Sequence, residues 1–449
     1  MKRNISKSIG FQGYHRPIGG VEDSELTHVD RDSPCGEYLR RYWQPIAMSS
    51  ELGELPLAVE ILGESLVLFR DGRGRLGLLH RHCSHRGASL EYGIVADQGI
   101  ICCYHGWHYD VDGCLLKAGS EPEYNSLCGR IVHGAYPTHE HNGIIFAYLG
   151  PPEERPEFPV YDTEVIADTD AVPFSITTPC NWLQIYENTQ DPVHVLHLHA
   201  RSSGVQFGKA SGLDQEIAYK TTPLGMINIQ SRRVGKNIWV RSTESILPNG
   251  NQTGAIFEEA EAEKYFQRSA ILRWMVPINN SATRTIGWRF FNPTLDPRHQ
   301  GDRDKVGKEM IDFIGQTEEE RPYSERQRQP GDYEAQISQR PIAVHTLENH
   351  GSSDAGVIRL RHMLRKQVRA LAAGQRVPHA APINDTIATF IQDTVFPHCT
   401  ALNMEEAQLL RDAGEQISNA VLESSHLTVE ERAAHIRSVC SKMKQNNSE

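Results

Sequence analysis

The sequence has no long apolar run. A helix needs about 20 consecutive apolar residues to cross a bilayer, whereas the longest apolar patches, such as 66–69, have only the length of a strand. The basic residues near the N-terminus are not followed by an apolar segment, as they would be in a secretory signal peptide. We therefore expect neither a membrane protein nor a secreted one.

Basic charge is also scarce. The 46 Lys and Arg residues are outnumbered by 57 Asp and Glu residues, which gives a net charge of −11. This balance speaks against a nucleic-acid partner or an anionic membrane surface. The nine cysteines are an odd number scattered along the chain, a pattern typical of a reducing cytoplasm rather than of a disulfide framework. We expect a cytoplasmic protein.

No G-x-G-x-x-G motif follows a strand-like segment, so we expect no site for NADH or flavin in this chain. No internal repeat is present either. The 449 residues, 39% of them apolar, are too many for one compact core. They indicate two or three globular domains.

Two short segments combine thiols and imidazoles in a fixed order. Cys83 and His85 form the first arm, and Cys102 and His105 form the second, in the pattern C-x-H-x16-C-x-x-H. A Rieske 2Fe–2S cluster is bound by two Cys on one iron and two His on the other. A tetrahedral zinc site also uses two Cys and two His, but usually pairs like ligands within each short segment. One Cys and one His in each arm therefore favour the 2Fe–2S cluster.

The segment around these arms has the pattern of a small antiparallel β structure. We expect strands at 57–62, 65–70, 76–81, 100–102 and 143–149. Asp71-Gly72 and Asp112-Gly113 predict hairpins, and both arms follow strand-like runs, so the ligands should lie on loops at one end. The proline-rich segment 150–156 is the best domain boundary.

The rest of the chain mixes helical and strand-like segments without the regular alternation of a dinucleotide-binding fold. We expect helices at 36–43, 181–189, 303–320, 354–374 and 405–444, the last broken near 424–425, and strands at 226–229 and 285–291. This is an α+β pattern.

A second cluster of metal-binding side chains lies at 187–199, with three His and two carboxylates. Two His and one carboxylate on one side of an iron are the ligands of non-haem Fe(II) enzymes that activate O₂. The alternative is a polar helix end, but the neighbouring electron-transfer cluster favours iron. His194 and His197 would share one face of a helix. His194 and His199 could share a metal only if the helix were locally unwound or bulged, and Pro192 makes such irregularity plausible.

These motifs carry a family resemblance that covers nearly the whole chain. The arms, followed by Arg86-Gly87 and Gly106-Trp107, resemble those of the large (alpha) subunits of Rieske non-haem iron aromatic-ring-hydroxylating oxygenases. Cys103 stands where that family usually has Pro. The stretch 330–339 resembles the phthalate dioxygenase and aryl O-demethylase branch.

The resemblance implies roles for residues of the second cluster. Its motif D-x-x-H-x4-H assigns the iron to His194 and His199 and leaves His197 outside. Asp191 would link His194 to the cluster ligand His105 of a neighbouring subunit, and Asn188 would line the iron pocket. Asp332 would be the third iron ligand, with Glu334 as its competitor.

The resemblance also implies an architecture. We expect an N-terminal arm and helix (1–42), an antiparallel β Rieske domain (43–152), a helix-on-sheet, helix-grip-like catalytic domain with the mononuclear iron (153–400) and a C-terminal helical extension (401–449).

The implied function is that of a terminal oxygenase with one Rieske 2Fe–2S cluster and one mononuclear Fe(II) per subunit. It would oxidise an aromatic substrate with O₂, by ring dihydroxylation, hydroxylation or demethylation. A separate NADH-dependent flavin and ferredoxin-type reductase would supply electrons, and three subunits would form a ring. The alternatives are a Rieske electron-transfer protein without oxygenase chemistry and a zinc-stabilised binding module.

Overall fold

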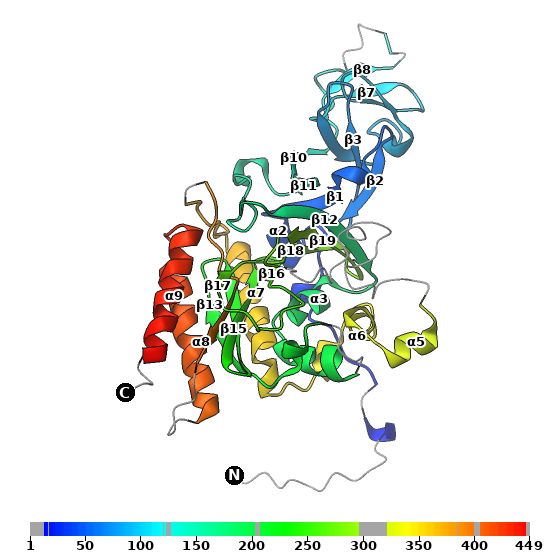
Figure 1. The fold of residues 1–449 in the computed structure, drawn as a ribbon. Helices are drawn as coiled ribbons and strands as arrows, with labels where there is room; N and C mark the ends of the chain where they lie inside the picture. The colour runs from blue at the N-terminus through cyan, green and yellow to red at the C-terminus, as the bar shows by residue number, and fades with distance from the viewer. Residues whose placement is uncertain are drawn as a thin grey trace.

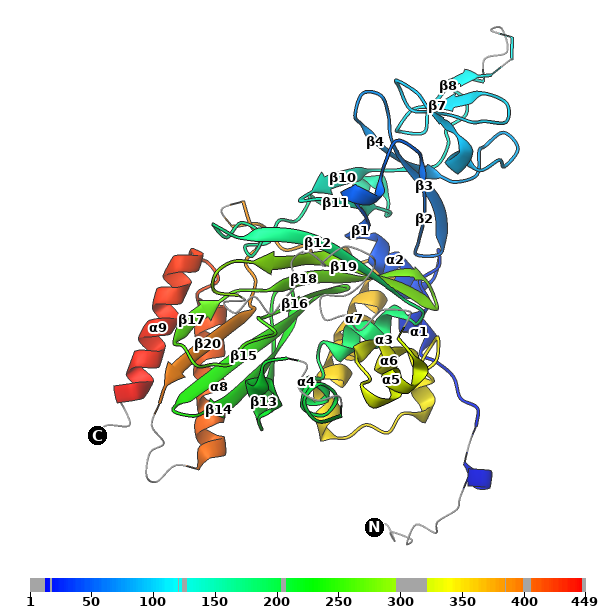
Figure 2. The same cartoon turned by 45° about the vertical axis from the view of Figure 1, so that its right-hand side comes forward.

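A computed structural model describes residues 13–16, 18–119, 121–122, 127–202, 207–295, 321–383, 385–398 and 405–445. A small β module projects from one end of a larger body, in which helices pack on a broad sheet (Figures 1 and 2). In the described ranges, no helix is both long and apolar enough to cross a membrane. The helix expected at 303–320 lies outside the described residues.

The projecting module consists of three small antiparallel sheets. The first contains β1 (Trp43–Met48), β11 (Ile144–Tyr148) and β10 (Thr138–His141); the second contains β2 (Leu57–Ile61), β3 (Glu64–Arg70), β4 (Leu76–His80) and β9 (Ala135–Tyr136); the third contains β5 (Ile94–Val95), β6 (Ile100–Ile101), β7 (Trp107–Tyr109) and β8 (Leu115–Ala118). These strands confirm the β pattern expected for this segment. Asp71 follows β3 and accepts hydrogen bonds from the main-chain nitrogens of Arg73 and Arg75, which forms the expected tight turn into β4.

Strand β3 lies between two hydrophobic cores. Because side chains alternate along a strand, Val67 and Phe69 enter a core at the tip of the module, whereas Leu66 and Leu68 enter the core of the main body. The tip core also contains Cys83 and Cys102. The main-body core includes residues of β1 and β11, so the base of the module is packed continuously onto the large sheet.

The main body is built on a nine-stranded antiparallel sheet. Its strands are β12 (Asp170–Thr178), β13 (Glu216–Thr221), β14 (Gly225–Val234), β15 (Asn237–Ile246), β16 (Gly250–Thr253), β17 (Lys264–Gln267), β18 (Ile271–Asn279), β19 (Ala282–Phe291) and β20 (Gln392–Pro397), and the main order is β12-β19-β18-β16-β15-β14-β13. The expected strands at 226–229 and 285–291 are confirmed as parts of β14 and β19.

Helices cover this sheet. They are α1 (Ser24–Thr27), α2 (Pro34–Arg40), α3 (Trp182–Asn188), α4 (Pro192–His197), α5 (Tyr323–Arg328), α6 (Asp332–Ile337), α7 (Ala355–Ala372), α8 (Glu406–Glu423) and α9 (Val429–Gln445). On β14, Ile229 and Ser231 face Gly414 of α8, while Gln230 on the other face lines a cavity beneath α3 and α4. The expected helices at 181–189, 354–374 and 405–444 are confirmed, including the break near 424–425. The helix expected at 36–43 ends at Arg40 because Trp43 already begins β1.

Candidate metal centres

The two cysteine–histidine arms form matching turns at the tip of the β module. The main-chain nitrogen of Gly87 donates to the carbonyl of Cys83 at 2.9 Å, and that of Gly106 donates to the carbonyl of Cys102 at 3.0 Å. Both glycines have positive φ angles, +76° and +68°. A side chain is disfavoured in this conformation, so glycine lets each arm fold back directly after its ligands.

The four side chains of the arms form an inner and an outer pair. Cys83 and Cys102 are 2% and 3% exposed, whereas His85 and His105 are partly open to solvent. The two imidazole rings lie 4.6 Å apart between centroids, and His85 stacks on Trp107 at 4.7 Å. Thiols inside and imidazoles outside are the arrangement that a Rieske cluster requires of its two irons.

The spacing of these side chains suits a two-iron cluster better than one zinc ion. Ligands of a tetrahedral zinc lie about 3.3–3.8 Å from one another. Within the described ranges, the ligand atoms of His194, His199 and Asp332 all lie within 4.8 Å of one another. The ligand atoms of the two cysteine–histidine arms do not form such a compact group there. In addition, the buried Nδ1 of His85 has no hydrogen-bond partner. An unpaired buried nitrogen is costly unless it binds a metal.

Two residues that the sequence analysis missed support the first arm. The hydroxyl of Tyr109 lies 3.2 Å from Sγ of Cys83, and burial, followed by contact with Cys83, raises the pKa of this phenol. The buried His133 bridges the first arm and β4, with Nδ1 2.7 Å from the hydroxyl of Ser84 and Nε2 2.7 Å from the carbonyl of His80. Tyr109 could have been found, because it points inward two residues after Trp107. His133 has no local signal, since only the fold brings it to the arm.

The second constellation is built on the broken helix α3–α4. The side chain of Asp191 caps α4 by accepting hydrogen bonds from the main-chain nitrogens of Val193 and His194 at 3.1 and 3.4 Å. Pro192 occupies the first position of the helix. An Asp cap followed by Pro is a favoured helix start, and it fixes the direction in which His194 leaves the helix.

A π-helical turn then decides which histidines meet. Helix α4 ends at His197, and the turn η5 (Leu198–Ser202) follows it directly. This wider turn brings the rings of His194 and His199 to 5.3 Å between centroids, whereas His197 is exposed. The local bulge that these two histidines need in order to share a metal is therefore present.

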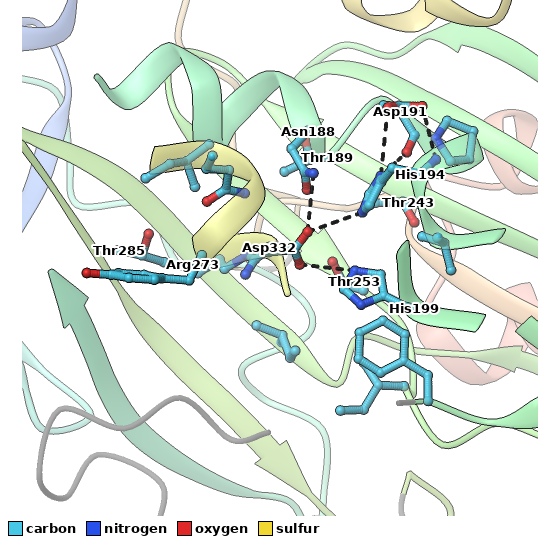
Figure 3. A pocket seen from close by; sticks show the side chains of 18 of the residues that line it. Asn188, Thr189, Asp191, His194, His199, Thr243, Thr253, Arg273, Thr285 and Asp332 are labelled. Atoms are coloured by element: carbon cyan, nitrogen blue, oxygen red, sulfur yellow. Dashed lines mark hydrogen bonds and ion pairs between the residues drawn. The ribbon is translucent and has the colours of Figure 1, made fainter. Parts of the chain in front are cut away.

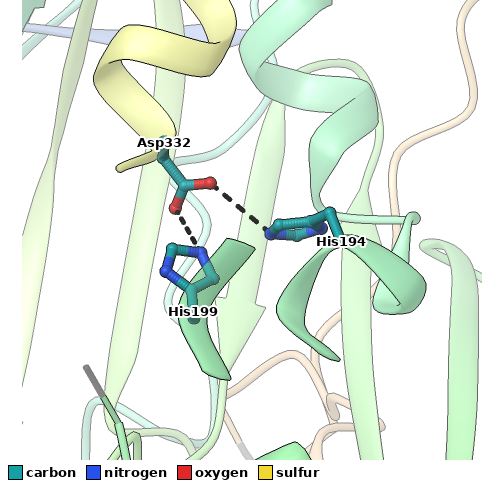
Figure 4. Close-up of side chains that lie close together, drawn as sticks. All are labelled: His194, His199 and Asp332. Atoms are coloured by element: carbon teal, nitrogen blue, oxygen red, sulfur yellow. Dashed lines mark ion pairs between the residues drawn. The ribbon is translucent and has the colours of Figure 1, made fainter. Parts of the chain in front are cut away.

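Asp332, the first residue of α6, completes the group (Figure 4). Its Oδ1 lies 3.4 Å from Nε2 of His194, and its Oδ2 lies 3.3 Å from Nε2 of His199. Burial would raise the pKa of Asp332, but His199, His194 and Arg273 together hold it below its usual value. Glu334 points elsewhere, since it accepts from the main-chain nitrogen of Gly331 at 2.8 Å and from Nε of Arg326 at 3.2 Å.

The hydrogen bonds of His194 leave one of its nitrogens available for a metal. Its Nδ1 donates to the main-chain oxygen of Asp191, so Nε2 carries the lone pair and faces Asp332. The carboxylate of Asp191 is 4.0 Å from the same Nδ1. Asn188 donates from Nδ2 to Oδ1 of Asp332 at 3.4 Å (Figure 3).

The group lies at one side of a cavity of about 150 Å³ between α3, α4, α6 and the large sheet (Figure 3). Both Asn188 and Asp191 line it, as does His194. A separate surface depression of about 440 Å³ reaches Asn188 and Asp191 from outside. The cysteine–histidine tip, beside β7, lies at the opposite end of the molecule from α4 (Figures 1 and 2).

Comparison with known proteins gives matches along the whole chain. Residues 42–127 match the family model of the Rieske [2Fe-2S] domain. The chain is 42% identical to the tert-butanol monooxygenase / tert-amyl alcohol desaturase oxygenase subunit of Aquincola tertiaricarbonis, over 96% of this chain and 95% of that protein. It is 34% identical to phenoxybenzoate dioxygenase subunit alpha of Ectopseudomonas oleovorans, over 80% and 88% of the two chains.

Solved structures with the same fold are more distant in sequence. The terminal oxygenase of carbazole 1,9a-dioxygenase from Nocardioides aromaticivorans IC177 aligns with a TM-score of 0.54 at 17% identity, over 77% of this chain and 96% of that chain. Dicamba monooxygenase bound to 3,6 dichlorosalicylic acid aligns with a TM-score of 0.53 at 18% identity, over 75% and 99%. These likenesses confirm the expected α+β fold, an antiparallel β module joined to a helix-on-sheet body.

Proposed function

This chain belongs to the Rieske non-haem iron oxygenases as an oxygenase (alpha) subunit, in the branch of the phthalate dioxygenases and aryl O-demethylases, and we propose that it carries its two metal groups on the residues described above. The chain is the terminal oxygenase component of a multicomponent system. The alternative of a zinc-stabilised module does not fit these relatives.

The proposed ligands of the 2Fe–2S cluster are Cys83, His85, Cys102 and His105. Buried thiols, partly exposed imidazoles and the unpaired Nδ1 of His85 support this assignment. The proposed ligands of the mononuclear iron are His194, His199 and Asp332. The observation that carries the function is that these three side chains offer ligand atoms within 4.8 Å of one another beside a cavity. When bound, the cluster supplies single electrons and the mononuclear iron supplies the site of O₂ activation.

The chain's own residues would orient these groups and the substrate. Asp191 holds Nδ1 of His194 through its main-chain oxygen and thereby directs Nε2 toward the iron site. Asn188 holds one oxygen of Asp332. The apolar side chains of the cavity would keep water away from the reacting carbon, which would keep O₂ activation coupled to the substrate. An electron-transfer protein without oxygenase chemistry would need neither this cavity nor the His₂–carboxylate group.

We also propose that catalysis needs a ring of three subunits, each with one cluster and one mononuclear iron. The tip and the iron site lie at opposite ends of one chain (Figures 1 and 2). The depression beside Asp191 is lined by more acidic than basic side chains, namely Glu187, Asp191, Glu348 and Asp354 against Arg340 and Arg361. The tip carries the exposed Arg86 near its histidines. This charge complementarity supports docking of the tip of a second copy, with His105 of the neighbouring protomer facing Asp191.

The domain limits follow the same proposal: a Rieske domain at 43–152, a catalytic domain at 153–400, and flanking segments at 1–42 and 401–449. A separate NADH-dependent reductase would supply the electrons, and the enzyme would work in a reducing cytoplasm. Of the relatives above, one is named for tertiary alcohols and one for an aromatic acid. We propose monooxygenation, as named for the more similar relative, for this chain.

Metal analysis tests the ligand assignment. The Asp332→Ala variant is expected to lose the mononuclear iron, so that about three irons per chain fall to about two, while the visible absorption of the cluster and the sulfide content remain. Glu334→Gln is the matched control, because this acid lies on the same helix and binds Arg326 instead. Loss of iron from Glu334→Gln together with retention in Asp332→Ala would contradict the assignment.

A further inference from the structure

The cavity beside His194, His199 and Asp332 is small and is lined by apolar side chains and by threonine hydroxyls. We propose that it binds a compact, neutral, hydroxyl-bearing substrate, an alcohol or phenol of about five to eight non-hydrogen atoms, and rejects aromatic carboxylates and two-ring molecules. This inference rests on the proposed function, because it concerns the substrate of the same site.

The volume of the cavity sets the upper size of the substrate. The cavity measures about 150 Å³, and a cavity of about this volume in another protein is filled by benzene. Sites for drug-sized ligands measure about 300–1,000 Å³. A second ring therefore has no room. The apolar walls are Ile176, Ile185, Ile256, Ile271, Val195 and Phe207.

These walls cannot move aside easily. Ile185, Ile256 and Ile271 are 5%, 7% and 2% exposed and belong to the continuous core of the main body. Protein interiors are packed as densely as organic crystals, so a larger ligand would have to displace several packed side chains. The size limit is therefore a property of the folded core.

Three threonines give the cavity its polarity. Thr178 on β12, Thr243 on β15 and Thr285 on β19 line it and are 4%, 8% and 4% exposed. In the described part of the chain, their hydroxyls make no hydrogen bond, whereas that of Thr253 donates to Asn251. A hydroxyl group both donates and accepts, so a substrate hydroxyl can pair with these threonines without leaving a buried polar atom unsatisfied.

The charges around the cavity disfavour an anionic substrate. Among the described lining residues, Arg273 is the one Arg or Lys, and its Nε already donates to Oδ1 of Asn251 at 3.3 Å. Two carboxylates, Asp191 and Asp332, line the same cavity. The one guanidinium is thus outnumbered by two carboxylates, and a substrate carboxylate would find no further cation besides the iron among lining residues that are otherwise apolar or neutral.

Matched substrates test the size limit and the charge preference of the cavity separately. The metal-loaded enzyme with a reductase is supplied with phenol, benzoate, 4-phenylphenol and 2-methylbutan-2-ol, and product formation and O₂ uptake are measured. We expect kcat/KM for phenol to exceed that for benzoate and that for 4-phenylphenol at least tenfold. Equal or better turnover of benzoate would overturn the charge argument, and turnover of 4-phenylphenol would overturn the size argument. The comparison of 2-methylbutan-2-ol with phenol shows whether the enzyme prefers an aliphatic alcohol or a phenol.

Binding is measured separately, by calorimetry on the anaerobic reduced holoenzyme. If phenol or the alcohol binds but no product forms with any substrate, the proposed function fails while this inference stands. If benzoate binds more tightly than phenol and the alcohol, the inference fails while the function stands.

Substitutions in the cavity walls test whether these side chains set the substrate selectivity. Ile256→Ala is expected to admit 4-phenylphenol and to raise its kcat/KM at least tenfold. Ile286→Ala is the control, because this buried residue on β19 lies beside Thr285 but does not line the cavity. Thr243→Val should weaken phenol binding about tenfold and leave toluene binding unchanged. If Ile256→Ala destabilises the fold, Ile256→Val provides a milder enlargement, and unchanged selectivity in a folded Ile256 variant would contradict the proposal.

Discussion

At the scale of single residues, the Tyr109 hydroxyl is the most direct contact to a proposed cluster ligand. It lies 3.2 Å from Sγ of Cys83 inside the tip core, where burial raises the pKa of the phenol and keeps its proton in place. A hydrogen bond to a cluster sulfur stabilises the reduced, more negative state and so raises the reduction potential.

Removing this hydroxyl should lower the potential without removing the cluster. Tyr109→Phe keeps the ring and loses one hydrogen bond of about 1 kcal/mol, which corresponds to roughly 40 mV for a one-electron couple. Redox titration followed by visible absorption measures the shift. Tyr104→Phe is the control, since Tyr104 lies on the second arm but is 59% exposed. An unchanged potential in Tyr109→Phe would show that the hydroxyl does not act on the cluster.

At the scale of elements, one residue at the start of helix α4 has two functions. Asp191 is both the cap of this helix and the residue proposed to face the neighbouring protomer. The π-helical turn after α4 then sets the angle between His194 and His199. The geometry of the proposed iron site therefore depends on how α4 begins and on how it ends.

Two substitutions separate these functions of Asp191. Asn caps helices as well as Asp does, so Asp191→Asn should retain iron and stability but lose most turnover. Asp191→Ala loses the cap as well, at a cost of about 1 kcal/mol, and should also bind iron more weakly. Iron content, thermal unfolding and single-turnover electron transfer from the reduced cluster are the measurements. Equal iron loss in both variants would mean that the charge of Asp191 supports the iron site itself.

Helix α9 is attached to the body through a buried arginine. The side chain of Arg432 is 1% exposed, and its Nη1 donates to Oδ2 of Asp162 at 3.1 Å while Nη2 donates to the carbonyl of Thr389 at 2.9 Å. Its guanidinium also lies 4.4 Å from the ring centre of Phe266. The last helix is therefore held by a charge pair inside the protein.

Breaking this pair should destabilise the protein strongly. Arg432→Ala removes the buried hydrogen bonds to Asp162 and Thr389, each of which contributes about 1.5–3 kcal/mol when one group is charged, while Asp162 keeps its ion pair with Arg268. Arg437→Ala, on an exposed position of the same helix, should cost less than about 1 kcal/mol. Thermal and urea unfolding measure both variants. Similar stabilities of the two variants would show that α9 contributes little to the fold.

At the scale of the whole molecule, the two proposed metal groups are far apart in each chain (Figures 1 and 2). Mixed assemblies test whether electrons pass between protomers. Cys102→Ser protomers lack the cluster and Asp332→Ala protomers lack the mononuclear iron, and each variant alone should be inactive. Mixed rings, formed by co-expression with two different affinity tags, should regain a part of the activity. Inactive mixed rings that contain both metal groups would exclude transfer between protomers.

The sequence by itself determined the turns of the two cysteine–histidine arms, because Gly87 and Gly106 act within a few residues of the proposed ligands. It also determined the α+β pattern, since alternation and turn residues are local properties of strands and hairpins. Helix geometry alone did not decide which two histidines lie together, because a π-helical turn depends on packing around His199 as well as on its sequence neighbours.

Only the tertiary structure decided the rest. Asp332, His133 and the walls of the cavity come from segments far apart in the chain, and no spacing in the sequence records their distances. The large sheet and α6 bring Asp332 to the two histidines and turn Glu334 toward Arg326. The cavity volume follows from side chains of several strands and helices packed together, so it exists only once the core has closed around it.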